Sequence, residues 1–222
     1  MLQVWRKVKY YFSFNSKRSM KKVLVPIAPG FEEIETITIV DILRRAGARV
    51  ILAGTVGGVL EGSRGVKIVP DELLDSVMED NFELICLPGG QPGTDNLKKD
   101  VRIGSLLKRM FKEDKLIGAI CAAPIILKKN NILENKFITS HPSVESVFKT
   151  ENYLCERVVV DGNLITSQSP GTAMEFALKL VEILFDSNRL KKVNQGILAR
   201  MWRQKRKIKT FQAFFYQMLA RL

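Results

Sequence analysis

The chain has 222 residues, 46% hydrophobic and 26% charged, which are ordinary proportions for a soluble globular protein with one substantial core. One histidine and three widely spaced cysteines exclude a disulfide framework and argue against a zinc site, so we expect no metal and a reducing, cytoplasmic setting. No apolar stretch approaches the roughly 20 residues needed to span a bilayer.

The formal net charge of +12 belongs to the two ends of the chain. Residues 1–31 hold seven Lys or Arg and residues 189–222 hold ten, and neither stretch contains an acid. Between them, 18 basic and 23 acidic residues leave a net charge of −5. The basic character therefore says little about the central part of the chain.

From Lys22 onward, short apolar runs alternate with longer amphipathic stretches. The pattern predicts strands over 23–27, 49–53, 66–69, 84–87, 116–120, 137–139, 158–160 and 164–166. It predicts helices over 33–46, 101–111, 125–129 and 172–185, with a helical turn at 71–77. Asp161-Gly162-Asn163 is a hairpin signal between the last two strands. The alternation predicts an α/β fold, a doubly wound and mostly parallel sheet flanked by helices.

In such sheets, ligands bind at the carboxyl ends of the strands, which here gathers residues 29–35, 88–93 and 121–124 along one edge. Cys121 lies where an apolar strand meets a helix, among small residues, which is the pattern of a sharp strand-to-helix elbow. The positive end of the helix dipole would lower the pKa of a thiol there and favour the thiolate. The alternative is an inert core cysteine.

Several short motifs together resemble one known family. They are Gly30-Phe31-Glu32-Glu33-Ile34-Glu35, Ser63-Arg64, Leu87-Pro88-Gly89-Gly90, Ala119-Ile120-Cys121-Ala122, Thr139-Ser140-His141-Pro142 and Ser169-Pro170-Gly171-Thr172. In this order the chain closely resembles the ThiJ/PfpI superfamily, and within it the parkinsonism-associated protein deglycase branch with its bacterial relatives. The resemblance covers about residues 21–200, which we expect to form the domain. It implies a flavodoxin-like fold, related to class I glutamine amidotransferases.

The resemblance implies that Cys121 is the nucleophile and that the Glu35 carboxyl is hydrogen-bonded to it. A carboxyl beside a thiolate in a partly apolar site should have a raised pKa and serve as a general acid or base. The alternative for Glu35 is an ordinary first-turn glutamate. The N–H groups of Gly89, Gly90 and Ala122 are candidates to hold an oxyanion, the alternative being a plain Pro-Gly-Gly turn.

In the family, a histidine matching His141 lies near the cysteine and an arginine matching Arg64 lies near the pocket. A structural polar residue and a solvated surface arginine are the alternatives. Two departures from the family matter. Ala122 replaces the histidine of the protease branch, which argues against peptidase chemistry, and Val69 replaces a cysteine that is frequent in the deglycase branch. Redox behaviour should therefore depend on Cys121 alone.

The leading hypothesis is a cofactor-independent cysteine hydrolase or lyase of the deglycase or glyoxalase III type. It would act on methylglyoxal, glyoxal or their adducts on proteins and nucleotides. The alternative is an oxidative-stress sensor and chaperone that uses the same cysteine. We expect a homodimer, since members of this branch generally pair and helix 33–46 carries surplus apolar surface.

The ends of the chain form two further segments. Residues 1–20 are basic and free of acid, as expected of a mitochondrial transit peptide or of translation from an upstream start with Met20 as the working initiator. Residues 201–222 have the pattern of a basic amphipathic helix. Contact of these tails with nucleic acid or an anionic membrane is the less favoured interpretation, and a solvated or self-docked tail is the simpler one.

Overall fold

The computed structural model describes residues 20–199. The segments predicted at 1–20, Met20 apart, and at 201–222 therefore lie outside the described residues. Within the described range no helix is both long enough and apolar enough to cross a membrane.

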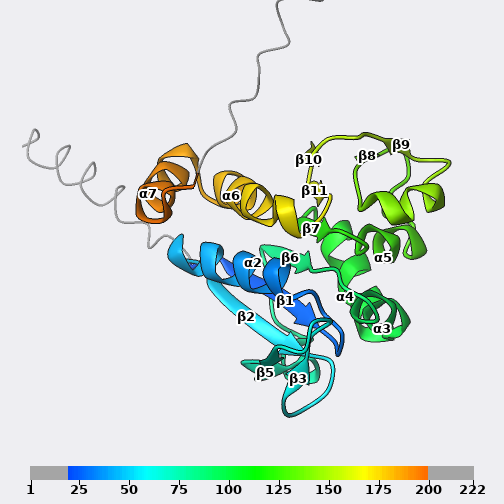
Figure 1. Cartoon of the computed structure of the whole chain (residues 1–222), viewed down its shortest axis with the longest axis horizontal. Coiled ribbons are helices and arrows are strands. Elements are labelled where there is room, and N and C mark those ends of the chain that lie inside the picture. The colour runs from blue at the N-terminus through cyan, green and yellow to red at the C-terminus, as the bar shows by residue number, and fades with distance from the viewer. Residues whose placement is uncertain (1–19, 200–222) are drawn as a thin grey trace, which may run out of the picture.

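A seven-stranded sheet forms the centre of the domain (Figure 1), in the order β10-β11-β7-β6-β1-β2-β5. Every neighbouring pair is parallel except β10 with β11, which is the hairpin predicted around Gly162. The strands are β1 (Lys22–Ile27), β2 (Arg49–Gly54), β5 (Glu72–Leu73), β6 (Leu84–Leu87), β7 (Leu116–Ile120), β10 (Val158–Asp161) and β11 (Leu164–Ser167). The predicted doubly wound, mostly parallel sheet is confirmed.

Helices cover both faces of this sheet. α2 (Glu33–Arg45), α6 (Ala173–Leu184) and α7 (Ser187–Ile197) pack on one face, and α3 (Gly93–Lys99), α4 (Val101–Lys112) and α5 (Pro124–Lys129) pack on the other. Successive side chains of β1 point to opposite faces of the sheet: Val23 and Val25 pack in the core on the α2 face, and Leu24 packs in the core on the α4 face. Burial on both faces explains why the strands are continuous apolar runs.

Short elements complete the fold. They are the strand pairs β3 (Leu60–Glu61) with β4 (Lys67–Ile68) and β8 (Phe137–Ile138) with β9 (Asn152–Tyr153), and the 3-10 helices η1 (Leu74–Val77), η2 (Pro142–Val147) and η3 (Pro170–Thr172). The helical turn predicted at 71–77 is divided between β5 and η1. The sequence pattern did not predict α3, which buries a single large apolar residue, Leu97. Nor was α7 predicted, although Leu190, Val193 and Ile197 recur at helical spacing.

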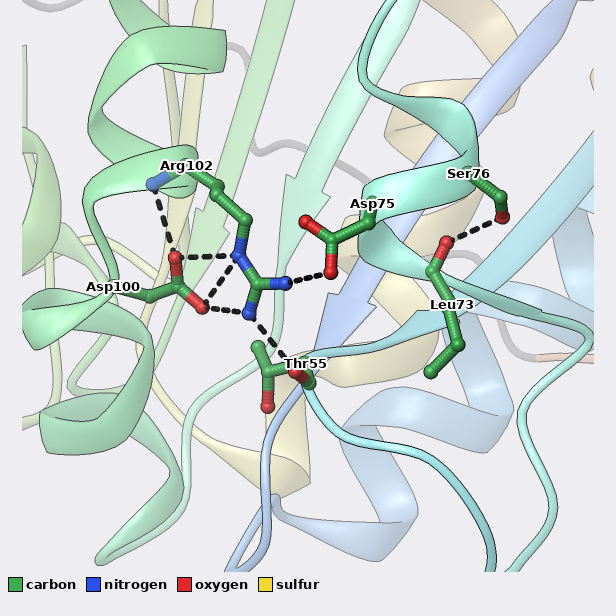
Figure 2. A network of polar contacts seen from close by, with 6 residues as sticks. All are labelled: Thr55, Leu73, Asp75, Ser76, Asp100 and Arg102. Atoms are coloured by element: carbon green, nitrogen blue, oxygen red, sulfur yellow. Dashed lines mark hydrogen bonds and ion pairs between the residues drawn. The ribbon is translucent and has the colours of Figure 1, made fainter.

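Arg102 joins the start of α4 to the loop after β2 and to η1 at the carboxyl edge of the sheet, as Figure 2 shows. Its guanidinium donates to Asp100, which also caps α4 by accepting from the Arg102 N–H at 2.9 Å. It donates as well to Asp75 of η1 at 2.7 Å and to the carbonyl of Thr55, after β2, at 2.9 Å. The hydrogen bond from Arg102 lowers the pKa of the Asp100 carboxyl.

We therefore predict that Arg102→Ala lowers the free energy of unfolding by about 1–3 kcal/mol, because the partly buried Asp100 carboxyl and Thr55 carbonyl lose a charged partner. A carboxyl with a lowered pKa stabilises the folded state above its unfolded pKa, and this stabilisation is lost as the pH falls. The variant should therefore lose less stability than the wild type between neutral and acidic pH. Urea unfolding at both pH values measures this. Lys108→Ala, on the exposed side of α4, is the control, and equal stability of the two variants would contradict the network's role.

Candidate active site

The elbow after β7 carries Cys121 in a strained backbone conformation, with a φ of 64°. Such a conformation costs a non-glycine residue about 1–3 kcal/mol and persists only where its surroundings enforce it. Here the N–H of Cys121 donates to the carbonyl of Ser167 on β11 at 3.0 Å, and its carbonyl accepts from the N–H of His141 at 2.8 Å. The backbone of the cysteine is thus held on both sides.

Small residues line this elbow and the strand before it. A Cβ on Gly118 of β7 would approach the sulfur of Cys86 and the ring of Phe176 to 3.1 Å. Alanines follow at 122 and 123, and α5 begins at Pro124. The thiol of Cys121 remains partly exposed at the turn, as the elbow pattern predicts.

Glu35 reaches the cysteine from the first turn of α2. Its N–H donates to the side chain of Glu32, the N-cap of the helix, at 2.7 Å. Its side chain is completely buried, and Oε2 accepts from the N–H of Gly89 at 2.7 Å. The carboxyl lies beside the thiol of Cys121, because the space that a Cβ on Gly89 would fill borders both Oε2 of Glu35 and the sulfur of Cys121. Oε1 is buried with no hydrogen-bond partner within residues 20–199.

Burial raises the pKa of the Glu35 carboxyl to about 8, and the nearby charge of Glu32 raises it too, whereas the N–H of Gly89 and the thiol of Cys121 act against this. At pH 7 the carboxyl therefore keeps its proton. A neutral acid of this kind can give a proton to a substrate oxygen and, once ionised, take one back.

The pKa of the Cys121 thiol differs from the expectation based on the helix dipole. Burial raises it, and the negative charge of an ionised Glu35 raises it further, while the N–H groups of Ala122 and Gly90 lower it. The lowered pKa expected of a thiol at a helix N-terminus is thus opposed by its partial burial and by its acidic neighbour. Because two adjacent negative charges disfavour each other, a protonated Glu35 is the condition under which the thiolate forms most easily.

Gly89 and Gly90 have different roles, which corrects the prediction that both donate to an oxyanion. The N–H of Gly89 is already used by Glu35, whereas the N–H groups of Gly90 and Ala122 face the sulfur of Cys121. A Cβ at Gly89 would lie 2.6 Å from the Cβ of Cys121 and 2.9 Å from Oε2 of Glu35. Gly90 has a φ of 93°, which disfavours any side chain.

His141 holds the elbow through its backbone. Its imidazole Nδ1 bonds the hydroxyl of Ser143 at 2.8 Å and accepts the N–H of that residue at 3.1 Å, so the side chain caps η2. Among the described residues no hydrogen bond joins the imidazole to Cys121 or Glu35. The structure thus places His141 beside the site, with Nδ1 of its imidazole engaged by Ser143.

Arg64 is exposed. Burial raises the pKa of the nearby Glu32 carboxyl, and the positive charge of Arg64 opposes this rise. The loop that carries it is held by Glu33, which sequence reasoning had assigned no role. The Glu33 carboxyl accepts from the N–H of Arg64 at 2.5 Å and from the hydroxyl of Ser63 at 3.1 Å, and is only 7% exposed. The three neighbouring glutamates thus have different roles: Glu32 caps α2, Glu33 holds the loop of Arg64, and Glu35 contacts the site. Only the three-dimensional contacts distinguish these roles.

The other two cysteines are set apart from this chemistry. Cys86 is fully buried in β6. Burial raises the pKa of its thiol strongly, and the negative charge of an ionised Glu35 raises it further. Cys155 is exposed after β9. Within the described residues, no group of three or more His, Cys, Asp or Glu side chains could hold a metal ion.

Comparison with known proteins defines the class to which this fold and site belong. Residues 21–183 match the DJ-1/PfpI family. A relative from Drosophila melanogaster, protein dj-1beta, is 43% identical over 181 residues, which cover 80% of this chain and 97% of the relative. The chain belongs to the DJ-1/PfpI family, and the predicted family is confirmed.

Two further comparisons agree. The crystal structure of Drosophila melanogaster DJ-1beta superimposes with a TM-score of 0.80 at 42% identity, covering 82% of this chain and 100% of that one. A Caenorhabditis elegans protein named as a glutathione-independent glyoxalase is 41% identical over 170 residues, which cover 75% of this chain and 90% of the relative.

The absence of a side chain at Gly89 should be essential to the site. We expect Gly89→Ala to slow alkylation of Cys121 by iodoacetamide about tenfold or more, because the added methyl displaces the thiol or the carboxyl. Peptide mapping after limited labelling gives the rate. Gly196→Ala in α7 is the control, since its Cβ would meet no atom within 4 Å. A wild-type rate in Gly89→Ala would show that the close contact around Gly89 is not required.

Proposed function

We propose that this protein is a cofactor-independent cysteine enzyme that converts reactive 2-oxoaldehydes such as methylglyoxal, with related action on early glyoxal adducts. The observation that carries the proposal is the completely buried Glu35 carboxyl, which contacts a partly exposed cysteine and keeps one oxygen unpartnered. Similarity to a relative named as a glutathione-independent glyoxalase supports it.

The residues suit addition of sulfur to an aldehyde. The Cys121 thiolate forms a C–S bond with the aldehyde carbon, and the carbonyl electron pair moves to oxygen, which takes the proton of Glu35. The N–H groups of Gly90 and Ala122 lie at the sulfur, where they stabilise the thiolate before attack. The product of this step is a hemithioacetal and a Glu35 carboxylate.

The carboxylate is then placed to act as a base. It removes the proton from the former aldehyde carbon and returns it to the neighbouring carbon. The oxygen of that carbon takes over the hydroxyl proton of the hemithioacetal, and a thioester remains on Cys121. Water hydrolyses the thioester to lactate and the thiol with release of a proton, so that methylglyoxal plus water gives lactate plus H⁺. On an early glycation adduct, the thiolate would form a C–S bond at the aminocarbinol carbon as the C–N bond breaks, and the proton of Glu35 would leave with the protein or nucleotide amine.

The redox-sensor and chaperone alternative uses the same thiol, and none of the contacts among residues 20–199 favours it over turnover. Oxidation of Cys121 would add oxygen atoms beside Glu35, whose proton would then bond a sulfinate oxygen. The two functions differ in one measurable respect, because only the enzyme needs Glu35 to cycle between its acid and its base forms.

Turnover of methylglyoxal should require both groups. We expect Cys121→Ser to abolish lactate formation and Glu35→Gln to reduce kcat by about 10²–10⁴-fold, because glutamine keeps a polar group but cannot transfer the proton. Chromatographic measurement of lactate tests this. Glu134→Gln, which neutralises an exposed glutamate between α5 and β8, should retain wild-type turnover.

Two outcomes would contradict the proposal. Wild-type protein that forms no lactate from methylglyoxal would reject the reaction. Undiminished turnover in Glu35→Gln would reject the role of the carboxyl and reduce Glu35 to a residue of the helix start.

We also propose a homodimer through the outer face of α2. Ile34 and Ile37 are 58% and 47% exposed on this helix, and exposed Val66 lies beside its first turn, where its N–H faces Glu33 at 3.5 Å. Large apolar side chains gathered in this way are typical of an interface between subunits.

We expect wild-type protein to have the mass of a dimer in light scattering at micromolar concentration and Ile37→Glu to have the mass of a monomer, because a buried charge would lose its hydration. Val101→Glu, on α4 at the opposite side of the sheet, should remain dimeric. A wild-type monomer would rule out the proposed interface.

A further inference from the structure

Residues 139–154, called the strap below, run from the end of β8 to just beyond β9 and lie against the elbow. At its start, the N–H of Thr139 donates to the hydroxyl of Thr166 on β11 at 2.9 Å. Two residues later, the N–H of His141 donates to the carbonyl of Cys121 at 2.8 Å. The strap is therefore attached to the backbone that carries the nucleophile.

Lys128, near the end of α5, attaches the far part of the strap to the same helix. Its ammonium donates to the carbonyl of Val147 at 2.7 Å, pairs with Glu151 at 3.0 Å and lies 5.9 Å from the centre of the Phe148 ring. Burial alone would raise the pKa of the Glu151 carboxyl, but the hydrogen bonds from Lys128 and Thr150 and the charge of Lys128 together lower it. The strap is therefore joined to the elbow directly through His141 and, near its other end, through Lys128 of the helix that follows the elbow.

Tyr153 stands at the centre of this arrangement. Its ring stacks on Phe148, with centroids 6.2 Å apart and planes 19° apart, and its hydroxyl donates to the carbonyl of Ser140 at 3.1 Å. That carbonyl and the N–H of His141 belong to one planar peptide group. The hydroxyl of Tyr153 and the carbonyl of Cys121 are thus bonded to opposite sides of the same peptide.

We propose that Tyr153 is a positioning residue for Cys121, holding the Ser140–His141 peptide so that its N–H keeps the elbow in its strained conformation. A positive φ at a cysteine persists only when its neighbours enforce it, and this N–H is one of the two backbone bonds that do so. A peptide whose carbonyl accepts a hydrogen bond is also a stronger N–H donor. The structure of the site carries this inference, and only its effect on turnover rests on the proposed function.

Loss of the tyrosine hydroxyl would let the elbow relax and move the sulfur away from the N–H groups of Gly90 and Ala122. Those donors favour the thiolate, so the reactive form would be less populated at neutral pH. The expected signature is slower chemistry at Cys121 without loss of the fold, since Tyr153→Phe keeps the ring and its stacking on Phe148.

The test is the pH profile of Cys121 alkylation by iodoacetamide in a Cys155→Ser background, with and without Tyr153→Phe. We expect the rate at pH 7 to fall about three- to tenfold and the profile to move to higher pH, since one pH unit corresponds to a tenfold change in thiolate. Hydrogen exchange of the His141 N–H should become faster. Phe137→Leu, on the neighbouring strand β8, should leave both measurements unchanged.

A wild-type alkylation profile and wild-type exchange at His141 in folded Tyr153→Phe would overturn the proposal. Lys128→Gln should give a smaller change in the same direction, and Lys129→Gln, whose lysine bonds the carbonyl of Lys98 instead, should give none. The assay is independent of carbonyl turnover. If wild-type protein makes no lactate while Tyr153→Phe still slows alkylation, the proposed function fails and the positioning role stands.

Discussion

The carboxyl of Glu35 is completely buried beside the thiol of Cys121, and the neighbouring structure is arranged around this contact. A buried carboxylate would be costly, so the group keeps its proton and becomes a neutral donor with a pKa of about 8. Gly89 makes the contact possible in two ways. Its N–H satisfies one carboxyl oxygen, and its missing side chain leaves the space in which the two groups meet.

Three segments distant in sequence supply this contact because their strands are neighbours. β1, β6 and β7 lie side by side and parallel, so the first turn of α2, the Gly89-Gly90 loop and the elbow emerge at one edge. Further contacts keep them in place. Glu33 holds the loop of Arg64 against α2, and Arg102 ties α4 to the loops after β2 and β5.

Much of this arrangement was predictable from the sequence because it follows from periodicity and local chemistry. Continuous apolar runs predicted the buried parallel strands, and the small residues around Cys121 predicted the elbow. The roles of Gly89 and His141 were not predictable, because they depend on which acceptor each backbone N–H faces. Glu33 was missed for the same reason, since nothing local distinguishes it from Glu32. The thiol pKa was expected from the helix terminus alone, whereas burial and a neighbouring carboxyl oppose that effect.

The central claim is that Glu35 is neutral at pH 7, and infrared spectroscopy measures this directly. In Cys121→Ser, which removes the coupled thiol, a protonated-carboxyl C=O band should be present at pH 7, disappear in the Cys121→Ser/Glu35→Gln double variant, and titrate with a midpoint near 8. A band that is already lost at pH 7, with a midpoint close to the ordinary glutamate value of about 4.3, would show that the carboxyl is ionised and would contradict the account.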